Sequence, residues 1–282
     1  MKTKISALSL VLYIILYVFL AVYFTACPGW GELPPNEVHI NSLSDAEKKL
    51  AEFSYPGVGT PNYPVWVFVN FDLGDLSRPD NNYLRLLEII EDSGLYVDLT
   101  LQNRMLEKNV FTSPPLSEAV KGMDKVVNIS LHGIATSIMA DSNEKSPFYF
   151  YENLVRVIGR GDNFTHIDNF AFSSCKSLER VDFYGVKTVG REAFNGCENL
   201  KRVDFPTALE TIGDKAFYDC SALERLSIRG KYPKLGDSVF LGSTPSRFIF
   251  NINKEYEGGF RRWINENASS FNNDGADIDF ER

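Results

Sequence analysis

A hydrophobic pattern recurs three times in the second half of the chain. The copies begin at Ile167, Val189 and Ile212, so they follow one another at steps of 22 and 23 residues. Four columns hold the same residue in every copy: Ala171, Ala193 and Ala216; Phe172, Phe194 and Phe217; Cys175, Cys197 and Cys220; Leu178, Leu200 and Leu223. A weaker fourth copy continues with Val239-Phe240 and Ile249. Recurrence of this kind predicts an architecture of stacked repeats.

Each copy contains two kinds of hydrophobic spacing. The Leu-x-x-Val-x-Phe part alternates with a period of two, which is typical of a short strand. The Ala-Phe-x-x-Cys-x-x-Leu part has helix-like spacing and predicts a tight helical or 3₁₀ turn. One copy cannot bury its own apolar face, so stacked copies are expected to share a core and a parallel sheet. The phenylalanine column then forms an aromatic spine, and Gly190 and Gly213 are expected at corners with positive φ.

The motif Ile-Gly-x-x-Ala-Phe-x-x-Cys-x-x-Leu-x-x-Val resembles the BspA-type leucine-rich repeat of treponemal and Bacteroides surface proteins. The resemblance covers Ile167 to Phe250, about a third of the chain. The wider plan is similar to that of treponemal members, with an amphipathic segment at 44–53 and an extended one at 61–69. Between Met139 and Thr165 the sequence departs from the pattern, and an insertion is expected there in place of a regular rung.

Strands and helices alternate before the repeats. Strands are expected at 65–73, 96–101 and 126–131, with amphipathic helices at 83–91 and 116–123. Because the strands begin about 30 residues apart, right-handed parallel crossovers should join them into one sheet. The region is therefore interpreted as larger cap rungs of the same sheet.

The fold class predicted is α/β: a leucine-rich-repeat solenoid with one parallel sheet, N-terminal βα cap rungs and a short C-terminal capping helix at Phe260–Glu266. The expected segments are a signal peptide at 1–26, a tether at 27–43, cap rungs at 44–138, an insertion at 139–165, repeats at 166–252, and a C-terminal cap and tail at 253–282.

The first residues of the chain are typical of an export signal. Lys2 and Lys4 precede a stretch without charge from Ile5 to Ala26. The junction Phe24-Thr25-Ala26-Cys27 resembles a bacterial lipobox with Phe24 in place of the usual Leu, which implies lipidation of Cys27. The alternative is an uncleaved anchor helix, since twenty-two uncharged residues are long enough to span a bilayer. Either reading leaves the rest of the chain outside the membrane, and the lipid-anchored reading places it in the cell envelope, at the outer membrane or the cell surface.

Composition and residue spacing limit the kinds of partner and site that the chain can have. A net charge of −8 without a basic run argues against a nucleic-acid partner. The three cysteines that recur in one column are interpreted as buried core residues, with a disulfide between neighbouring rungs as the alternative. No metal-ligand spacing appears, and His39, His132 and His166 are not paired with a nucleophile, so neither a cofactor nor catalysis is expected. An enzyme with a site in the 139–165 insertion is the weaker alternative.

Charged residues occupy the outward positions of the predicted repeat strands. The candidate binding face consists of Arg180, Asp182, Tyr184, Arg202, Asp204, Arg225 and Ser227. A solvated surface with salt bridges of little energetic weight is one interpretation. The other is a surface that recognises proteins, as solenoids commonly do, and the family resemblance implies adhesion to host matrix or other cell-surface proteins. The leading hypothesis is a lipid-anchored surface protein, and the alternative is a structural periplasmic lipoprotein without an external ligand.

Overall fold

A computed structural model describes residues 36–102, 110–132, 135–161, 163–205 and 209–243, the backbone of 247–252 and 277–279, and residues 259, 262–263 and 266–267. The chain divides into two compact units, Met1–Asn36 and Glu37–Arg282, and the second is described below. The predicted signal peptide and Cys27 lie outside the described residues. Within these residues no helix has the length and apolar character needed to cross a bilayer.

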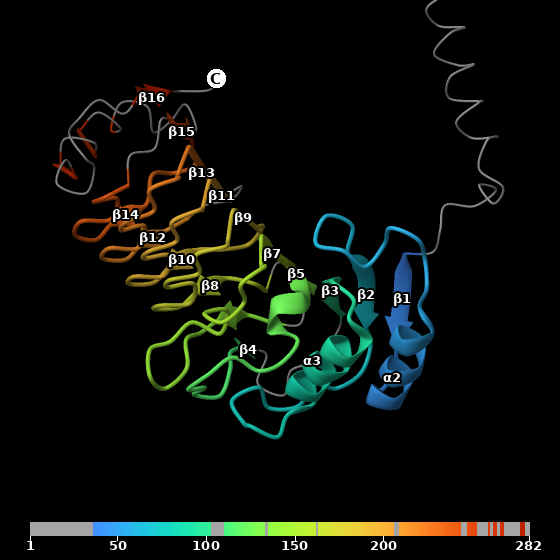
Figure 1. Cartoon of the computed structure of the whole chain (residues 1–282). Coiled ribbons are helices and arrows are strands. Elements are labelled where there is room, and N and C mark those ends of the chain that lie inside the picture. The colour runs from blue at the N-terminus through green and yellow to red at the C-terminus, as the bar shows by residue number, and fades with distance from the viewer. Residues whose placement is uncertain are drawn as a thin grey trace, which may run out of the picture. The chain divides into compact units, whose positions relative to one another are not determined.

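A ten-stranded parallel sheet runs through the second unit (Figure 1). Its strands, in spatial order, are β1 (Glu37–Ile40), β2 (Val65–Val69), β3 (Val97–Gln102), β5 (Val126–His132), β7 (Arg156–Arg160), β9 (Arg180–Phe183), β11 (Arg202–Phe205), β13 (Arg225–Gly230), β15 (Arg247–Ile252) and β16 (Asp277–Asp279). The spatial order follows the chain order. The predicted α/β solenoid with cap rungs in the same parallel sheet is therefore confirmed.

A second parallel sheet completes each rung, a feature that the sequence interpretation did not include. It has six short strands: β4 (Val110–Phe111), β6 (Ser137–Ile138), β8 (His166–Ile167), β10 (Thr188–Val189), β12 (Thr211–Ile212) and β14 (Lys234–Leu235). Each strand is two residues long, because only the residues before the Ala-Phe turn pair with the next rung. His166 lies in one of these strands, β8.

Two helices lie in the N-terminal rungs. Helix α2 (Leu43–Glu52) is capped by Ser42, and α3 (Asn82–Ser93) begins after Asn81 and ends at Gly94 in the left-handed conformation. The third predicted helix, at 116–123, is wrong. That segment contains bends and turns, followed by the one-turn 3₁₀ helix η1 (Met123–Lys125). Two adjacent prolines, Pro114 and Pro115, precede it, and they favour an extended backbone over a helical start.

Two segments differ from the boundaries expected from the sequence. Strand β1 occupies the end of the predicted tether and pairs with β2 over its whole length. Strand β7 lies inside the predicted insertion and pairs with both β5 and β9, so this segment supplies a rung of the sheet. Phe148, Tyr151, Leu154 and Val157 are all buried and have the same spacing as the Phe, Cys, Leu and Val columns of the repeat. Tyr151 occupies the position where the other rungs have Cys, and this difference hid the rung in the sequence.

The predicted aromatic spine is present and longer than expected. The rings of Phe172 and Phe194 stack with centroids 4.9 Å apart, and those of Phe194 and Phe217 with centroids 5.0 Å apart. The stack continues to Phe240 on one side and through Phe148 to Phe111 on the other. All six rings are almost completely buried. Burial of these rings, repeated rung by rung, accounts for the rigidity expected of the solenoid.

The glycine column has a different cause from the one predicted. Neither Gly190 nor Gly213 has a positive φ. A Cβ at Gly190 would lie 2.5 Å from the backbone nitrogen of Asn169, and a Cβ at Gly213 would lie 2.6 Å from that of Arg191. Glycine is required here because adjacent rungs approach closely. Two positions after this column, non-glycine residues adopt the left-handed conformation, namely Phe170, Glu192, Lys215 and Ser238.

The cysteine column is buried, as predicted, and its three members are free thiols. The thiol of Cys197 donates to the carbonyl of Phe172, and that of Cys220 to the carbonyl of Phe194, at 3.0 and 3.1 Å. Ser243 fills the same column in the following rung and donates to the carbonyl of Phe217. In these three rungs the column therefore holds a small donor that satisfies a buried carbonyl of an earlier rung, whereas the thiol of Cys175 lies 3.2 Å from the hydroxyl of Ser146.

The thiols of Cys175, Cys197 and Cys220 are expected to resist alkylation at neutral pH while the protein is folded. Burial raises the pKa of Cys175 and of Cys220 to about 12, and it raises that of Cys197 as well, so the reactive thiolate is scarce. Iodoacetamide labelling followed by peptide mass spectrometry measures this, with guanidinium-unfolded protein as the positive control. Rapid labelling of any of the three in the folded protein would contradict the packed column.

The C-terminal segment is described only in part. Much of the predicted capping helix lies outside the described residues, but Trp263 is helical and buried. Its indole N–H donates to the carbonyl of Pro233 at 2.8 Å, and its ring packs against Tyr232. Strand β16 lies in the region expected to be a tail, where it pairs in parallel with β15.

Candidate functional site

The candidate binding face forms on β9, β11 and β13 because their side chains alternate. Val181 and Phe183 of β9 point into the core, so Arg180 and Asp182 project from the opposite side. The register aligns Arg180, Arg202 and Arg225 across the three strands. Asp182, Asp204 and Ser227 align in the same way two positions later.

Six of the seven predicted face residues line one hollow of about 260 Å³. They are Arg180, Asp182, Tyr184, Asp204, Arg225 and Ser227, and Arg229 joins them. Arg202 is exposed on the strand between those of Arg180 and Arg225. The seven predicted residues, that is Arg202 and the six that line the hollow, are called the charged strand face below. The structure thus brings the predicted residues together on one surface, and their role in binding stays a prediction.

The aspartate column is less exposed than the sequence interpretation assumed. Asp182 is 6% exposed and Ser227 is 4% exposed, so neither offers much surface to a partner. The Asp182 carboxylate accepts from Arg156 Nε at 2.6 Å and from Arg180 Nη2 at 2.8 Å, and these two arginines cover it. The hydrogen bond from Arg180 to Asp182 raises the pKa of the Arg180 guanidinium. Asp182 therefore positions arginines and is not itself a contact surface.

The arginine column is longer than the predicted set. The backbone register places Arg156 of β7 beside Arg180, and Arg247 of β15 beside Arg225. Both were detectable in the sequence, because each directly precedes the apolar residue of the strand column, as Arg180 precedes Val181. Sequence reasoning missed Arg156 because it lies in the segment interpreted as an insertion.

Positive charge exceeds negative charge on this face, although the whole chain carries a net charge of −8. Arg180, Arg202 and Arg225 of the face and the neighbouring Arg156 and Arg229 carry positive charge, against Asp182 and Asp204. Arg225 Nε is buried, lies 3.9 Å from Asp204 and makes no hydrogen bond within the described chain, so a partner cannot reach this atom. The exposed Arg202 is the member of the column whose guanidinium donors face solvent most openly.

An aromatic side chain borders the charged strand face. Tyr184 is 49% exposed, and the Arg160 guanidinium lies 5.8 Å from the centre of its ring. Exposed tyrosine and arginine are the residue types most often found at the energetic centres of protein interfaces.

Side chains suited to metal binding or to proton transfer do not cluster in the described part of the chain. No cluster of three or more His, Cys, Asp or Glu side chains suited to a metal ion occurs in the described part of the chain. Burial and the nearby Arg160 lower the pKa of His132. The exposed His166 accepts or donates a hydrogen bond at Nδ1 to the hydroxyl of Thr165, its chain neighbour.

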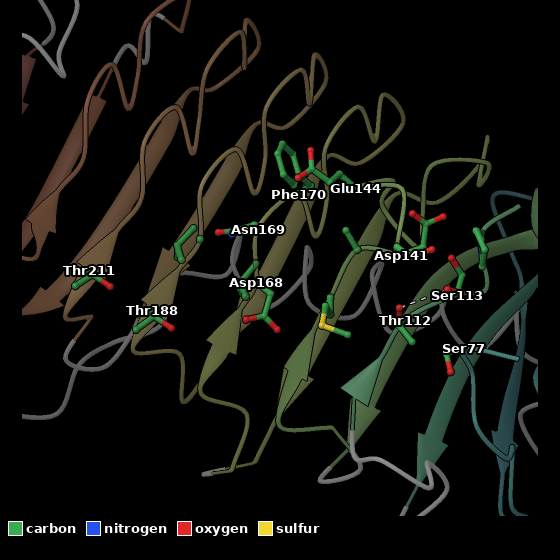
Figure 2. Close-up of a pocket in the computed structure, with 17 residues that line it drawn as sticks. Ser77, Thr112, Ser113, Asp141, Glu144, Asp168, Asn169, Phe170, Thr188 and Thr211 are labelled. Carbon is green, nitrogen blue, oxygen red and sulfur yellow. Dashed lines mark hydrogen bonds between the residues drawn. The ribbon is translucent and has the colours of Figure 1, made fainter.

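A second and larger concavity lies on the six-stranded sheet (Figure 2). It has a volume of about 810 Å³ and is bounded by the Met139–Glu144 loop and by residues of β8, β10 and β12. The weaker alternative from the sequence placed a site in the 139–165 segment, whose first residues line this cleft, but none of the residues of the predicted binding face does.

The repeats match a known family. The model of the "BspA type Leucine rich repeat region" matches residues 144–258 in six copies. These residues form a BspA-type leucine-rich repeat region. The match begins inside the segment first interpreted as an insertion, in agreement with the rung that β7 provides. Proteins of this repeat family typically bind other proteins and are not enzymes.

Two solved structures resemble the chain. A leucine-rich repeat protein from Bacteroides ovatus is 18% identical, with a TM-score of 0.44, over 80% of this chain and 57% of that one. A leucine rich cell surface protein from Faecalibacterium prausnitzii is 21% identical, with a TM-score of 0.29, over 54% of this chain and 45% of that one. The chain thus spans about half the length of these two proteins. No curated protein matches the chain.

Proposed function

We propose that the protein is a lipid-anchored surface protein whose BspA-type repeats bind a protein partner through the charged strand face. The observation that carries the proposal is the arginine column, which is held in register on successive strands and only partly neutralised by Asp182 and Asp204. Side chains aligned on a rigid sheet lose little conformational entropy on binding, which favours affinity.

The charge of the face favours an acidic partner surface. Arginine forms paired hydrogen bonds with carboxylates, and Asp182 already fixes the position of Arg156 and Arg180. The exposed ring of Tyr184 adds apolar contact area at the edge. Host matrix proteins and proteins on other bacterial cells are the candidate classes of partner.

A pull-down with the immobilised chain tests the function itself. Extracts of host matrix and of bacterial surfaces are the source of partners, and bound proteins should elute as the salt concentration rises, because screening weakens contacts between exposed charges. Failure to retain any protein above the level of a blank resin would contradict the proposed function.

The anchor belongs to the same proposal. Lipidation at Cys27 would hold the repeats at the membrane, with Pro28 to Pro35 as the connecting segment. Metabolic labelling with a radioactive fatty acid should mark the wild type and not Cys27→Ser. An unlabelled wild type would favour the alternative of an uncleaved anchor helix.

Exposure at the cell surface is tested by a separate experiment from lipid anchoring. Protease added to intact cells should degrade a surface protein. A structural periplasmic lipoprotein should survive until the cells are broken, and that outcome would support the alternative function.

A further inference from the structure

The 810 Å³ cleft on the six-stranded sheet owes its wall to a local lengthening of one rung. Phe148 follows Ile138 of β6 by ten positions, whereas Phe172 follows Ile167 of β8 by five. The additional residues form the loop Asp141–Lys145 beside the strands. Gly190, in the glycine column, is among the residues that line the cleft.

The loop is held firmly, so the cleft is preformed. Asp141 Oδ1 accepts from the backbone nitrogens of Asn143 and Lys145 at 2.8 and 2.9 Å. The Lys145 ammonium donates to the carbonyl of Leu116 at 3.0 Å and lies 4.8 Å from the centre of the Phe150 ring. A preformed concavity of this size is typical of sites for small ligands.

A row of polar side chains lines the cleft, with hydrogen-bonding capacity that the described residues leave unused. Asp168, Thr188 and Thr211 project from β8, β10 and β12 or directly after them, and Figure 2 shows them side by side. Neither the Asp168 carboxylate nor the two threonine hydroxyls bond to any other described residue. Asn169 uses its Oδ1 to accept from the nitrogen of Arg191 at 2.8 Å, which leaves its Nδ2 as a donor.

The charges of the cleft exclude an anionic ligand and disfavour a simple cation. No Lys or Arg is among its described lining residues. Glu144 lies 3.6 Å from the guanidinium of Arg191. Asp141 Oδ1 is occupied within the loop, and its Oδ2 is buried, so a ligand cannot reach it. Among the described lining residues, Asp168 is therefore the carboxylate that a ligand can use. A cation would use that carboxylate but would leave the Asn169 amide and the hydroxyl donors unpaired, at a cost to affinity.

The same cleft also presents apolar surface. Met139 is 44% exposed at its edge, and Pro115 and Phe170 line it. Neighbouring hydroxyl, carboxylate and amide groups beside apolar surface complement a pyranose chain, which has hydroxyls at its rim and C–H groups on its faces.

We propose that this cleft binds a neutral oligosaccharide. The Asp168 carboxylate accepts hydrogen bonds from two adjacent sugar hydroxyls, while Asn169 Nδ2 and the hydroxyls of Thr188 and Thr211 bond to others. Met139 covers a C–H face of the sugar. This site lies on the other sheet from the charged strand face and goes beyond the proposed function, so protein capture and glycan binding are separable activities.

An oligosaccharide array that carries both neutral and anionic glycans tests the proposal, with the labelled full chain as the probe. Retention on one or more neutral glycans is expected, followed by calorimetry with the free glycan. Asp168→Asn should weaken that binding by at least about tenfold, since a charge-assisted acceptor is lost. Asp237→Asn is the matched control, because Asp237 is exposed on the same side of the solenoid and does not line the cleft.

Thermal unfolding of each variant checks whether the fold is retained. The proposal is overturned if no neutral glycan is retained, if only anionic glycans are retained, or if Asp168→Asn binds as well as the wild type. Arg180→Glu with Arg202→Glu should leave glycan binding unchanged, so failure of the protein-binding proposal is distinguishable from failure of this one.

Discussion

Replacing Phe194 by Ala is expected to lower the free energy of unfolding by about 3–5 kcal/mol, the usual cost of emptying a phenylalanine site in a core. The ring is completely buried and stacks on Phe172 and Phe217, at centroid distances of 4.9 and 5.0 Å. Its loss opens a cavity in the middle of the spine and removes two ring contacts. A domain is commonly stable by only about 5–15 kcal/mol, so much of the stability is lost.

Denaturant unfolding measured by circular dichroism tests this result. Tyr63→Ala is the control, because that side chain is 70% exposed and its removal should change stability by no more than about 0.5 kcal/mol. A loss below about 1 kcal/mol for Phe194→Ala would show that the spine does not support the solenoid.

Reversal of two charges in the arginine column, by Arg180→Glu with Arg202→Glu, is expected to abolish partner capture. The change places carboxylates where an acidic partner surface docks, and like charges brought together there cost several kcal/mol. Since each 1.4 kcal/mol is about a factor of ten in affinity, binding should weaken by at least about a hundredfold. Thermal unfolding should remain cooperative, because both side chains lie on the outside of the sheet.

The matched control reverses two charges on the other sheet. Lys187→Glu with Lys234→Glu produces the same change in net charge on exposed residues of the six-stranded side. Capture should survive in this variant. If the arginine variant captured partners as well as the wild type did, the charged strand face would be excluded as the binding surface.

The repeat itself was predictable from the sequence because its columns are occupied by identical residues. Three identical Phe, Cys and Leu positions fix the period, and the period fixes the parallel sheet and the spine. The arginine column follows from the same alignment. Its extension to Arg156 was missed because Tyr151 stands in the Cys column, which concealed one rung.

Other features depend on contacts between rungs and leave little trace in the sequence. The glycine column is visible in the sequence, but glycine is needed there because the neighbouring backbone approaches closely and not because φ is positive. Burial of Asp182 arises from Arg156 on the next strand, 26 residues away. The cleft beside Asp168 depends on a loop whose position only the folded chain defines.

The most direct measurement of the central claim is site-specific photo-crosslinking to the captured protein. A benzoylphenylalanine in place of Arg202 lies at the centre of the charged strand face, and one in place of Thr211 lies on the six-stranded sheet. Crosslinking from position 202 and none from position 211 is the predicted result. Crosslinking from position 211 alone would place the partner on the other sheet and contradict the proposed mode of binding.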